Sequence, residues 1–164
     1  MKELLHLYAA HNFWANKQLI DSIKQLTAEQ INQPIPSSFP SIYKTVLHLF
    51  DAESIWWQRL KLEEHVERPS ERFTGNFDEL QQGLLNQSAQ FEQWTNGLLE
   101  HQLLHVFAYR RSKTELYKQP VYQTLLHIFN HGSYHRGQLV TMLRQLNVTN
   151  IPQTDFNAYL RQKK

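Results

Sequence analysis

The amino-acid sequence predicts an all-α protein. The expected fold is a four-helix bundle of the up-down-down-up type, with a long crossover before the last long helix and a short C-terminal helix. Only five glycines and six prolines occur in 164 residues, and apolar residues recur mostly at three- and four-residue steps. Four stretches with this period are long enough for bundle helices. Because 164 residues suit one domain and no stretch resembles a linker to a second domain, we expect a single domain over residues 1–164.

The first two long helices are expected at residues 3–25 and 41–62. Leu4, Tyr8 and His11 begin a helical period that continues through the first of these segments. The cluster NQPIPSSFPS at 32–41 holds three prolines and predicts a loop. The second segment carries most of its apolar residues on one face, as expected for a helix against a core.

The third helix is expected after a long, charged connection at residues 63–75. Asn76 and Glu79 fit a capping box that opens this helix, because each side chain can accept a hydrogen bond from the other residue's backbone N–H. The helix should end near Leu99.

The last third of the chain begins with a different pattern. In 103–118 apolar residues alternate on either side of the turn-like RRSK, which predicts either a short hairpin or an extended crossover. Pro120 suits the first turn of a fourth helix that reaches about Leu146. After Pro152, Thr154 could cap the short final helix.

Composition narrows the classes of function. The chain has no cysteine, which excludes disulfides and cysteine-based metal sites and suits a reducing compartment. A net charge of +2, with no long basic run beyond the terminal RQKK, disfavours nucleic acid as a partner. No apolar run approaches membrane-spanning length, and the short LLHLYAA at 4–10 fits the first helix better than a signal peptide. We therefore expect a soluble cytoplasmic protein without a membrane partner.

The segment HIFNHGSYHRGQL at 127–139 places three histidines on one helical stripe. His127, His131 and His135 span about 80° of the helix surface, and histidines four residues apart can direct their nitrogens to one point. A metal site needs a third ligand from another segment, and His48, in the middle of the second helix and off its apolar face, is the best donor. Solvated histidines would show the same spacing, so the pattern alone leaves both interpretations open. The remaining histidines are interpreted as structural or exposed, among them His11, His65, His101 and His105.

Two charged residues lie on apolar helix faces. Glu53 falls among the apolar residues of the second helix and Arg136 among those of the fourth. A buried charge is costly unless it is paired, so we expect a buried or half-buried Glu53–Arg136 ion pair that fixes the register of the two helices. The alternative is that either side chain reaches solvent past its neighbours. Gly132, and Gly137 in the same way, would let another helix approach closely.

Three segments give the chain a resemblance to a known family. They are AHNFWANKQLI (10–20), LHLFDAESIWW (47–57) and HIFNHGSYHRGQL (127–139), and they are similar to helices of the DinB (DinB/YfiT-like) family of bacterial four-helix-bundle proteins. The resemblance covers nearly the whole chain, and NHxxxHRGQ is its most specific part. It implies one divalent metal ion, zinc or nickel before iron or manganese, bound by His48, His131 and His135. His11 departs from the family pattern, which more usually has tyrosine there, and is either an extra polar group near the cavity or a surface change.

The resemblance also implies an activity. Some family members resemble thiol S-transferases that use a low-molecular-weight thiol, and others are grouped with metal-dependent hydrolases or DNA-damage-inducible proteins. Either enzyme would act on a small-molecule substrate, with Gln138, His127 and Asp51 as candidate catalytic residues that orient the nucleophile or accept its proton. Family members often form homodimers. The alternatives are a non-catalytic metal-binding stress protein and a dimeric interaction module whose histidines bind no metal.

Overall fold

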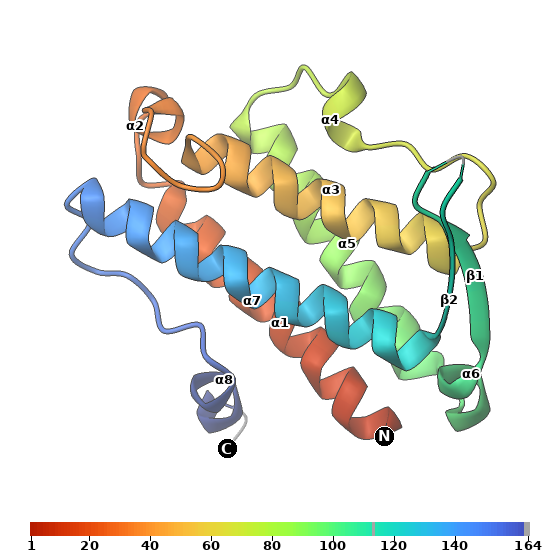
Figure 1. Cartoon of the computed structure of the whole chain (residues 1–164). Coiled ribbons are helices and arrows are strands. Elements are labelled where there is room, and N and C mark those ends of the chain that lie inside the picture. The colour runs from red at the N-terminus through yellow and green to blue at the C-terminus, as the bar shows by residue number, and fades with distance from the viewer. Residues whose placement is uncertain (113, 163–164) are drawn as a thin grey trace.

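Four long helices form the body of the protein. The computed structural model describes residues 1–112 and 114–162, in which the long helices are α1 (Lys2–Ile23), α3 (Ile42–Leu60), α5 (Phe77–Gly97) and α7 (Val121–Gln145). Helices α1 and α3 each pack against α5 and α7, so α1 and α3 lie diagonally across the bundle. In Figure 1, α1 and α7 run in one direction and α3 and α5 in the other. The expected all-α, up-down-down-up bundle is confirmed.

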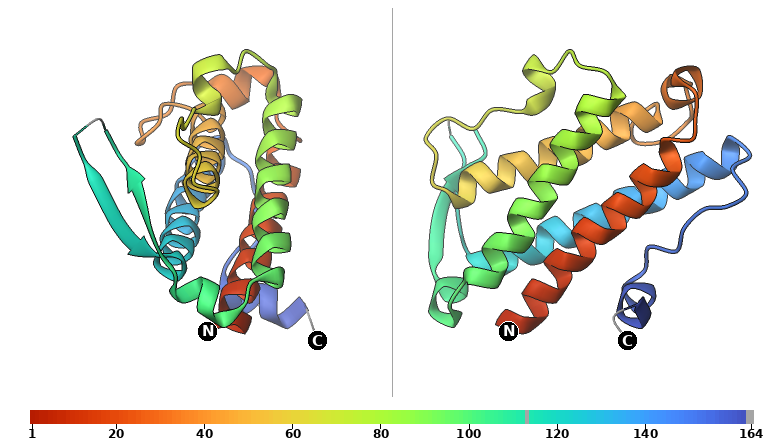
Figure 2. Two further views of the ribbon diagram at one scale, coloured as in Figure 1. Left: turned by 90° about the vertical axis from the view of Figure 1, so that its right-hand side faces the viewer. Right: turned by 180° about the vertical axis from the view of Figure 1, so that it is seen from behind.

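The connections between the long helices differ from expectation in one respect. Because α3 and α5 run in the same direction, residues 61–76 must return along the bundle, and they include the one-turn helix α4 (Pro69–Arg72). The segment before α7 is a hairpin, which confirms one of the two alternatives for 103–118, and the long crossover expected there is wrong. Its strands β1 (Val106–Arg110) and β2 (Leu116–Pro120) are antiparallel and splay away from the bundle, as Figure 2 shows. Lys113 of the expected RRSK turn lies outside the described residues.

Side-chain caps explain where several helices begin. The Asn76 side chain accepts the Glu79 N–H at 3.0 Å, and the Glu79 carboxylate accepts the Asn76 N–H at 2.9 Å, which confirms the capping box of α5. The final helix is capped by Asp155 and not by Thr154, since the Asp155 carboxylate accepts the Ala158 N–H at 2.9 Å. The other helices of the described residues are α2 (Ala28–Asn32), α6 (Glu100–Leu104) and the expected α8 (Phe156–Gln162). Helices α2, α4 and α6 were not predicted, because they are too short for a periodic pattern.

Apolar side chains form two separate clusters along the bundle. One cluster includes Leu19, Leu49, Leu84 and Leu139. The other includes Leu5, Phe91, Val121, Leu125 and Phe129. In each long helix, the residues of the two clusters are separated by a short stretch that carries buried polar side chains. Among the described residues, no helix has the length and apolar character needed to cross a membrane.

A buried polar layer, formed by Asn12, Asn16, Glu53, Ser88 and Arg136, joins all four long helices between these clusters. The Glu53 carboxylate of α3 accepts hydrogen bonds from Asn12 (2.8 Å) and Asn16 (3.1 Å) of α1 and from Ser88 (2.7 Å) of α5. Arg136 of α7 donates to the side-chain oxygens of the same Asn12 (2.7 Å) and Asn16 (2.9 Å). None of the five residues is more than 3 % exposed. The layer therefore couples the axial positions of the four helices.

The expected direct ion pair between Glu53 and Arg136 is wrong. Both residues are buried, but no salt bridge joins them within the described residues. The carboxamides of Asn12 and Asn16 lie between the two charges, because an amide offers a donor to the carboxylate and an acceptor to the guanidinium. Burial raises the pKa of Glu53 and lowers the pKa of Arg136 to about 10, so the guanidinium stays protonated at neutral pH.

Gly132 makes room for the polar layer. A Cβ atom at this position would lie 2.8 Å from the Asn12 oxygen and 2.9 Å from the Arg136 nitrogen that bonds to it, whereas a Cβ at Gly137 would meet nothing within 4 Å. Gly132 therefore allows the close approach of neighbouring side chains. The same role was expected for Gly137, and that expectation is wrong.

Alanine at the two glycines of α7 should have opposite effects on stability. Gly132→Ala should destabilise the protein by about 1–3 kcal/mol, because the buried layer must shift. Gly137→Ala should stabilise it by about 0.5–1 kcal/mol, because alanine has the higher helix propensity and no clash occurs. Urea unfolding of both variants measures the difference. Equal changes in the two variants would show that the layer can absorb a methyl group.

Candidate metal centre

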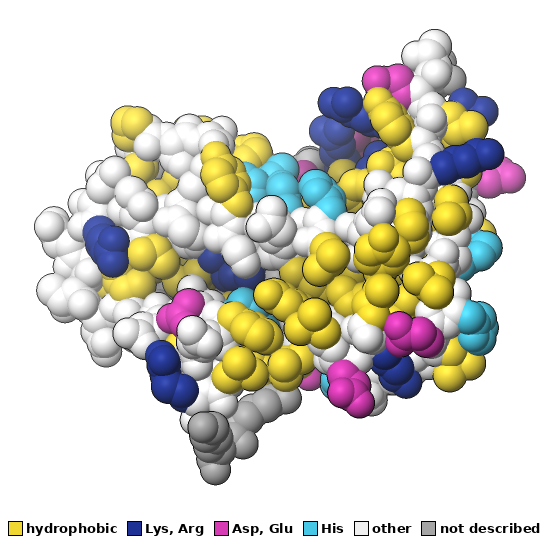
Figure 3. All heavy atoms as spheres, turned by 60° about the horizontal axis from the view of Figure 1, so that its bottom comes forward, with side chains coloured by type: hydrophobic (Ala, Val, Ile, Leu, Met, Phe, Trp, Pro, Cys, Tyr) yellow, Lys and Arg dark blue, Asp and Glu magenta, His cyan; other side chains and the backbone are white. Residues whose placement is uncertain are grey.

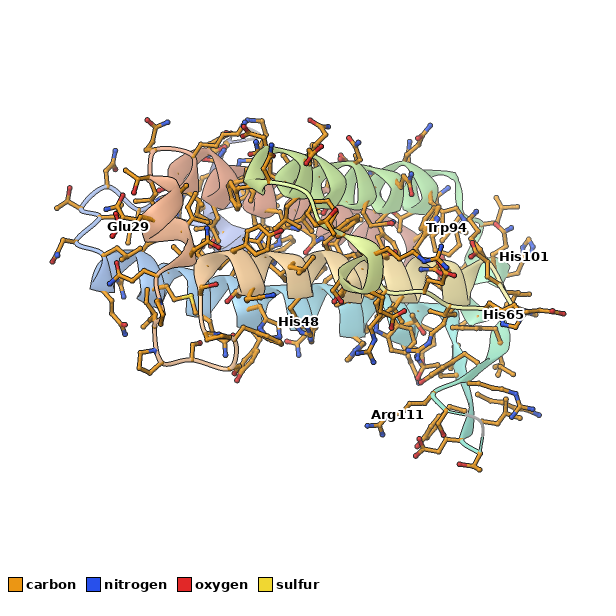
Figure 4. The ribbon with its side chains drawn as sticks, turned by 90° about the horizontal axis from the view of Figure 1, so that it is seen from above. Glu29, His48, His65, Trp94, His101 and Arg111 are labelled. Atoms are coloured by element: carbon orange, nitrogen blue, oxygen red, sulfur yellow. The ribbon has the colours of Figure 1, made fainter. Side chains whose placement is uncertain are left out.

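His48 of α3 and His131 and His135 of α7 converge on one point. Their Nε2 atoms are separated by 3.2 Å between His48 and His131 and by 3.1 Å between His131 and His135. Figure 3 shows histidine side chains gathered at the surface of the molecule, beside Lys and Arg side chains on the hairpin side. In Figure 4 the labelled His48 points out of the bundle. The three histidines thus form a group that could hold a metal ion.

All three ligand nitrogens lie within 4.8 Å of one another, and two of their three separations fit a single ion. Two nitrogens that bind one zinc ion at about 2.0–2.1 Å lie about 2.9 Å apart at a right angle and about 3.3 Å apart at the tetrahedral angle. The separations of 3.1 and 3.2 Å fall between these limits. Three ligands occupy three positions of a tetrahedral or larger coordination shell, so at least one position is left for a water molecule or a substrate.

Gln138 sets the orientation and tautomer of His135. The Gln138 side-chain oxygen lies 2.7 Å from His135 Nδ1, and its amide nitrogen donates to the Ser38 hydroxyl at 2.8 Å. Because the amide oxygen only accepts, Nδ1 carries the proton and Nε2 presents its lone pair to the other two rings. Gln138 was expected as a catalytic candidate, but its contacts are those of a residue that positions a ligand.

The environment keeps the imidazoles neutral. Burial, with a further contribution from the neighbouring His135, lowers the pKa of His48 and of His131 to about 4. Burial also lowers the pKa of His135, against the opposite effect of the hydrogen bond that His135 donates to Gln138. Neutral imidazole is the form that binds metal ions, so the site is ready to bind at neutral pH without releasing protons from these rings.

Removing the Gln138 amide should weaken metal binding without abolishing it. We expect Gln138→Ala to lower the affinity for Zn²⁺ by about 10- to 100-fold, because the His135 ring loses the partner that fixes its tautomer. Isothermal titration with Zn²⁺ measures the change. Gln123→Ala is a matched control, since this exposed glutamine of the same helix hydrogen-bonds only Tyr122 among the described side chains. An unchanged affinity in Gln138→Ala would contradict the assigned role.

Phe39, in the loop before α3, covers one side of the histidine group. Its ring stacks on His48 with ring centres 4.1 Å apart, and it lies 5.7 Å from the His135 ring. Neither Phe39 nor Ser38 was predicted to lie near the site, because the prolines of residues 32–41 indicate only a loop. No spacing rule links a loop residue to a helix that lies far away in the sequence.

The other two catalytic candidates lie beside the histidine group. The exposed His127 ring is 5.8 Å from the His131 ring and packs edge-on against Trp56 at 5.2 Å. Asp51 accepts the Ser70 N–H at 2.8 Å, which anchors α4 to α3. Neither residue belongs to the convergent group of ligand atoms.

His11 belongs to a different part of the molecule. It is 4 % exposed, and its Nε2 donates to the Thr154 carbonyl at 2.9 Å, while its ring packs edge-on against Phe156. Burial lowers its pKa, so the neutral ring is favoured. The structural role expected for His11 is confirmed, because it is a buried contact between α1 and the segment that leads into α8. It is neither a surface residue nor part of the histidine group.

A pocket of about 400 Å³ lies next to the histidine group. His48 and His131 line it together with Asp51, and the other walls come from α3, the 61–76 connection and the hairpin. This volume is within the range of small-molecule sites. His48 and His131 therefore belong both to the candidate metal centre and to the wall of the pocket.

Comparisons with known proteins agree with this architecture. The DinB family model matches residues 1–164. The curated Protein DinB of Bacillus subtilis (strain 168) is 29 % identical over 159 residues, which is 92 % of this chain and 90 % of that protein. The crystal structure of a DinB-like protein from Bacillus cereus ATCC 10987 superposes with a TM-score of 0.63 at 17 % identity, over 85 % of this chain and 89 % of the other. The structural likeness concerns the fold alone.

Proposed function

The chain belongs to the DinB family, and from this premise we propose that it is a metal-dependent enzyme, a thiol S-transferase or a hydrolase, with one divalent ion on His48, His131 and His135. Zinc or nickel suits three imidazole ligands best, ahead of iron or manganese. The observation that carries the proposal is the convergence of the three Nε2 atoms beside a pocket of about 400 Å³. A site that only clamped two helices would not need such a pocket.

A divalent ion on three neutral ligands keeps its full charge and lowers the pKa of a water molecule or thiol that it binds. The residues around the site supply position and shape. Gln138 holds the His135 ring, and Phe39 shields one side of the site from water. Asp51, the carboxylate that lines the pocket, would accept a proton from the nucleophile through the oxygen that Ser70 does not use.

Two measurements test this function. Protein purified without a His-tag or chelator should contain about one divalent ion per chain by elemental analysis. The metal-loaded protein should then turn over members of a panel that combines low-molecular-weight thiols with electrophiles, or members of an ester panel. Metal without turnover would favour the non-catalytic stress protein, and no metal would favour the interaction module.

Assembly as a homodimer remains a prediction from the family. Large apolar side chains are exposed on the surface, including Leu4 at 51 % and Leu126 at 42 %, and Figure 3 shows hydrophobic side chains gathered on one face. A surface of this kind is typical of protein interfaces. Light scattering coupled to size-exclusion chromatography would detect the dimer, and a monomer at high concentration would contradict it.

A further inference from the structure

Three arginines from separate segments line the pocket beside the histidine group. Arg59 comes from α3, Arg68 from the 61–76 connection and Arg111 from the turn that follows β1, and all three share the pocket with His48 and His131. In Figure 4, Arg111 reaches from the hairpin toward the face from which His48 projects. The fold therefore brings three positive charges to the mouth of the candidate metal centre.

These charges are not balanced by the protein. None of the three arginines forms a salt bridge within the described residues. Asp51 is the sole carboxylate among the residues that line the pocket, and one of its oxygens already accepts the Ser70 N–H. Burial lowers the pKa of Arg59, and so do the like charges of Arg68 and Arg111, although Tyr109 acts in the opposite direction. Positive charges that line one pocket and repel each other favour the binding of an anion there.

Arg59 is held in place for such a contact. Its guanidinium lies over two aromatic rings that contact each other edge-on, 4.6 Å from the centre of Trp56 and 4.9 Å from the centre of Tyr109. The Nη2 atom of Arg59 donates weakly to the Arg110 carbonyl at 3.4 Å, and its buried Nε has no hydrogen-bond partner among the described residues. A stacked guanidinium with an unused donor loses little conformational entropy when it binds an anion.

The balance of charge is more positive in this pocket than in the groove that adjoins it. Arg59, Arg68 and Arg111 also line the adjoining groove. Arg110 and three acidic residues, Glu63, Glu64 and Glu71, line this outer part as well. None of them lines the inner pocket. An anionic group would thus be drawn to the end nearest His48 and His131.

We propose that this pocket selects a small organic anion as the substrate. Arg59, Arg68 and Arg111 bind a carboxylate or phosphate group, while Trp56 and Tyr109 contact the apolar part of the molecule. The reactive end of the substrate then faces the open side of the histidine group. The inference rests on the proposed function and adds to it the chemical class of the substrate.

A pair of probes that differ only in charge tests the inference. We expect 4-mercaptobenzoate to bind about 10- to 100-fold more tightly than 4-mercaptobenzamide, as for hydrogen bonds to a charged group. Isothermal titration should show this preference in both the zinc-loaded and the apo protein, because the arginines do not depend on the ion. Phenyl phosphate, as a third probe, distinguishes a phosphate site from a carboxylate site by which anion binds more tightly.

Two variants and a control test whether the arginines of the pocket cause the preference for the charged probe. Arg59→Met and Arg111→Met should each remove most of the charge preference. Arg111 is exposed, so its replacement should leave folding intact even if Arg59→Met loosens the hairpin. Arg144→Met, at an exposed position near the end of α7 outside the pocket, should keep the preference.

The outcomes separate this inference from the proposed function. Equal binding of the two probes, or a preference that survives Arg111→Met, overturns the anion site, and zinc binding measured in parallel would then still support the metal centre. A charge preference in protein that binds no zinc supports the anion site and overturns the metal-dependent function.

Discussion

Replacing Arg136 with methionine should destabilise the apo protein by about 3–5 kcal/mol, the cost typical of leaving one buried charge without its partner. Arg136 donates to Asn12 and Asn16, which in turn donate to Glu53. Without the guanidinium, the Glu53 carboxylate is buried with no positive charge nearby. The side-chain oxygens of Asn12 and Asn16 also lose the hydrogen bonds that they accept from Arg136. Urea unfolding in the presence of a chelator measures the loss without interference from bound metal.

The layer also predicts strong coupling between the two charges. Glu53→Leu combined with Arg136→Met should cost less than the sum of the two single changes, because the double variant leaves no unpaired buried charge. Lys17→Met is the control, since it removes an exposed pair with Asp21 and should change stability by about 1 kcal/mol or less. If Arg136→Met resembled this control, the polar layer would not contribute to stability in the way described.

His131→Ala should abolish the stabilisation of the protein by metal. At a free zinc concentration about 100 times the dissociation constant, binding adds about 2.7 kcal/mol. For a chain of this length that raises the melting temperature of the unmodified protein by about 5–10 °C. His131 is the middle ligand, within 3.2 Å of both other nitrogens, so its loss should weaken binding by more than the roughly 100-fold cost of losing an outer partner.

The comparison is made between melts with and without zinc, so any change in the stability of the apo variant cancels. His101→Ala is the matched control, because this exposed histidine lies at the far end of the molecule in Figure 4. The His101→Ala variant should keep the full zinc-dependent rise in melting temperature. A full shift in His131→Ala would mean that the ion binds elsewhere.

The long helices and the histidine group could be predicted because their signals are local or periodic. The capping box at Asn76 depends on residues three apart, and the period of the apolar residues places His48 and His131 off the core faces of their helices. The hairpin was one of two alternatives for 103–118, and the alternation of Phe107 with its neighbours favoured it.

The polar layer shows what sequence reasoning missed. Glu53 and Arg136 were recognised as charges on apolar faces, but the same test was not applied to Asn12 and Asn16. These two asparagines also lie one turn apart within a buried face of their helix, so a signal was present. No comparable signal exists for Arg59, Arg68 and Arg111, because only the tertiary structure brings three distant segments together.

One consequence of the polar layer concerns how the protein would acquire its ion. A slip of α7 by one residue, about 1.5 Å along the axis, would break the bonds of Arg136 and also move His131 and His135 away from His48. The scaffold thus assembles the ligands beforehand, unlike small zinc domains that are unfolded without metal. Removal and re-addition of the ion should leave the helical circular dichroism spectrum unchanged. The identity of the metal bound in cells would then depend on which divalent ion is available.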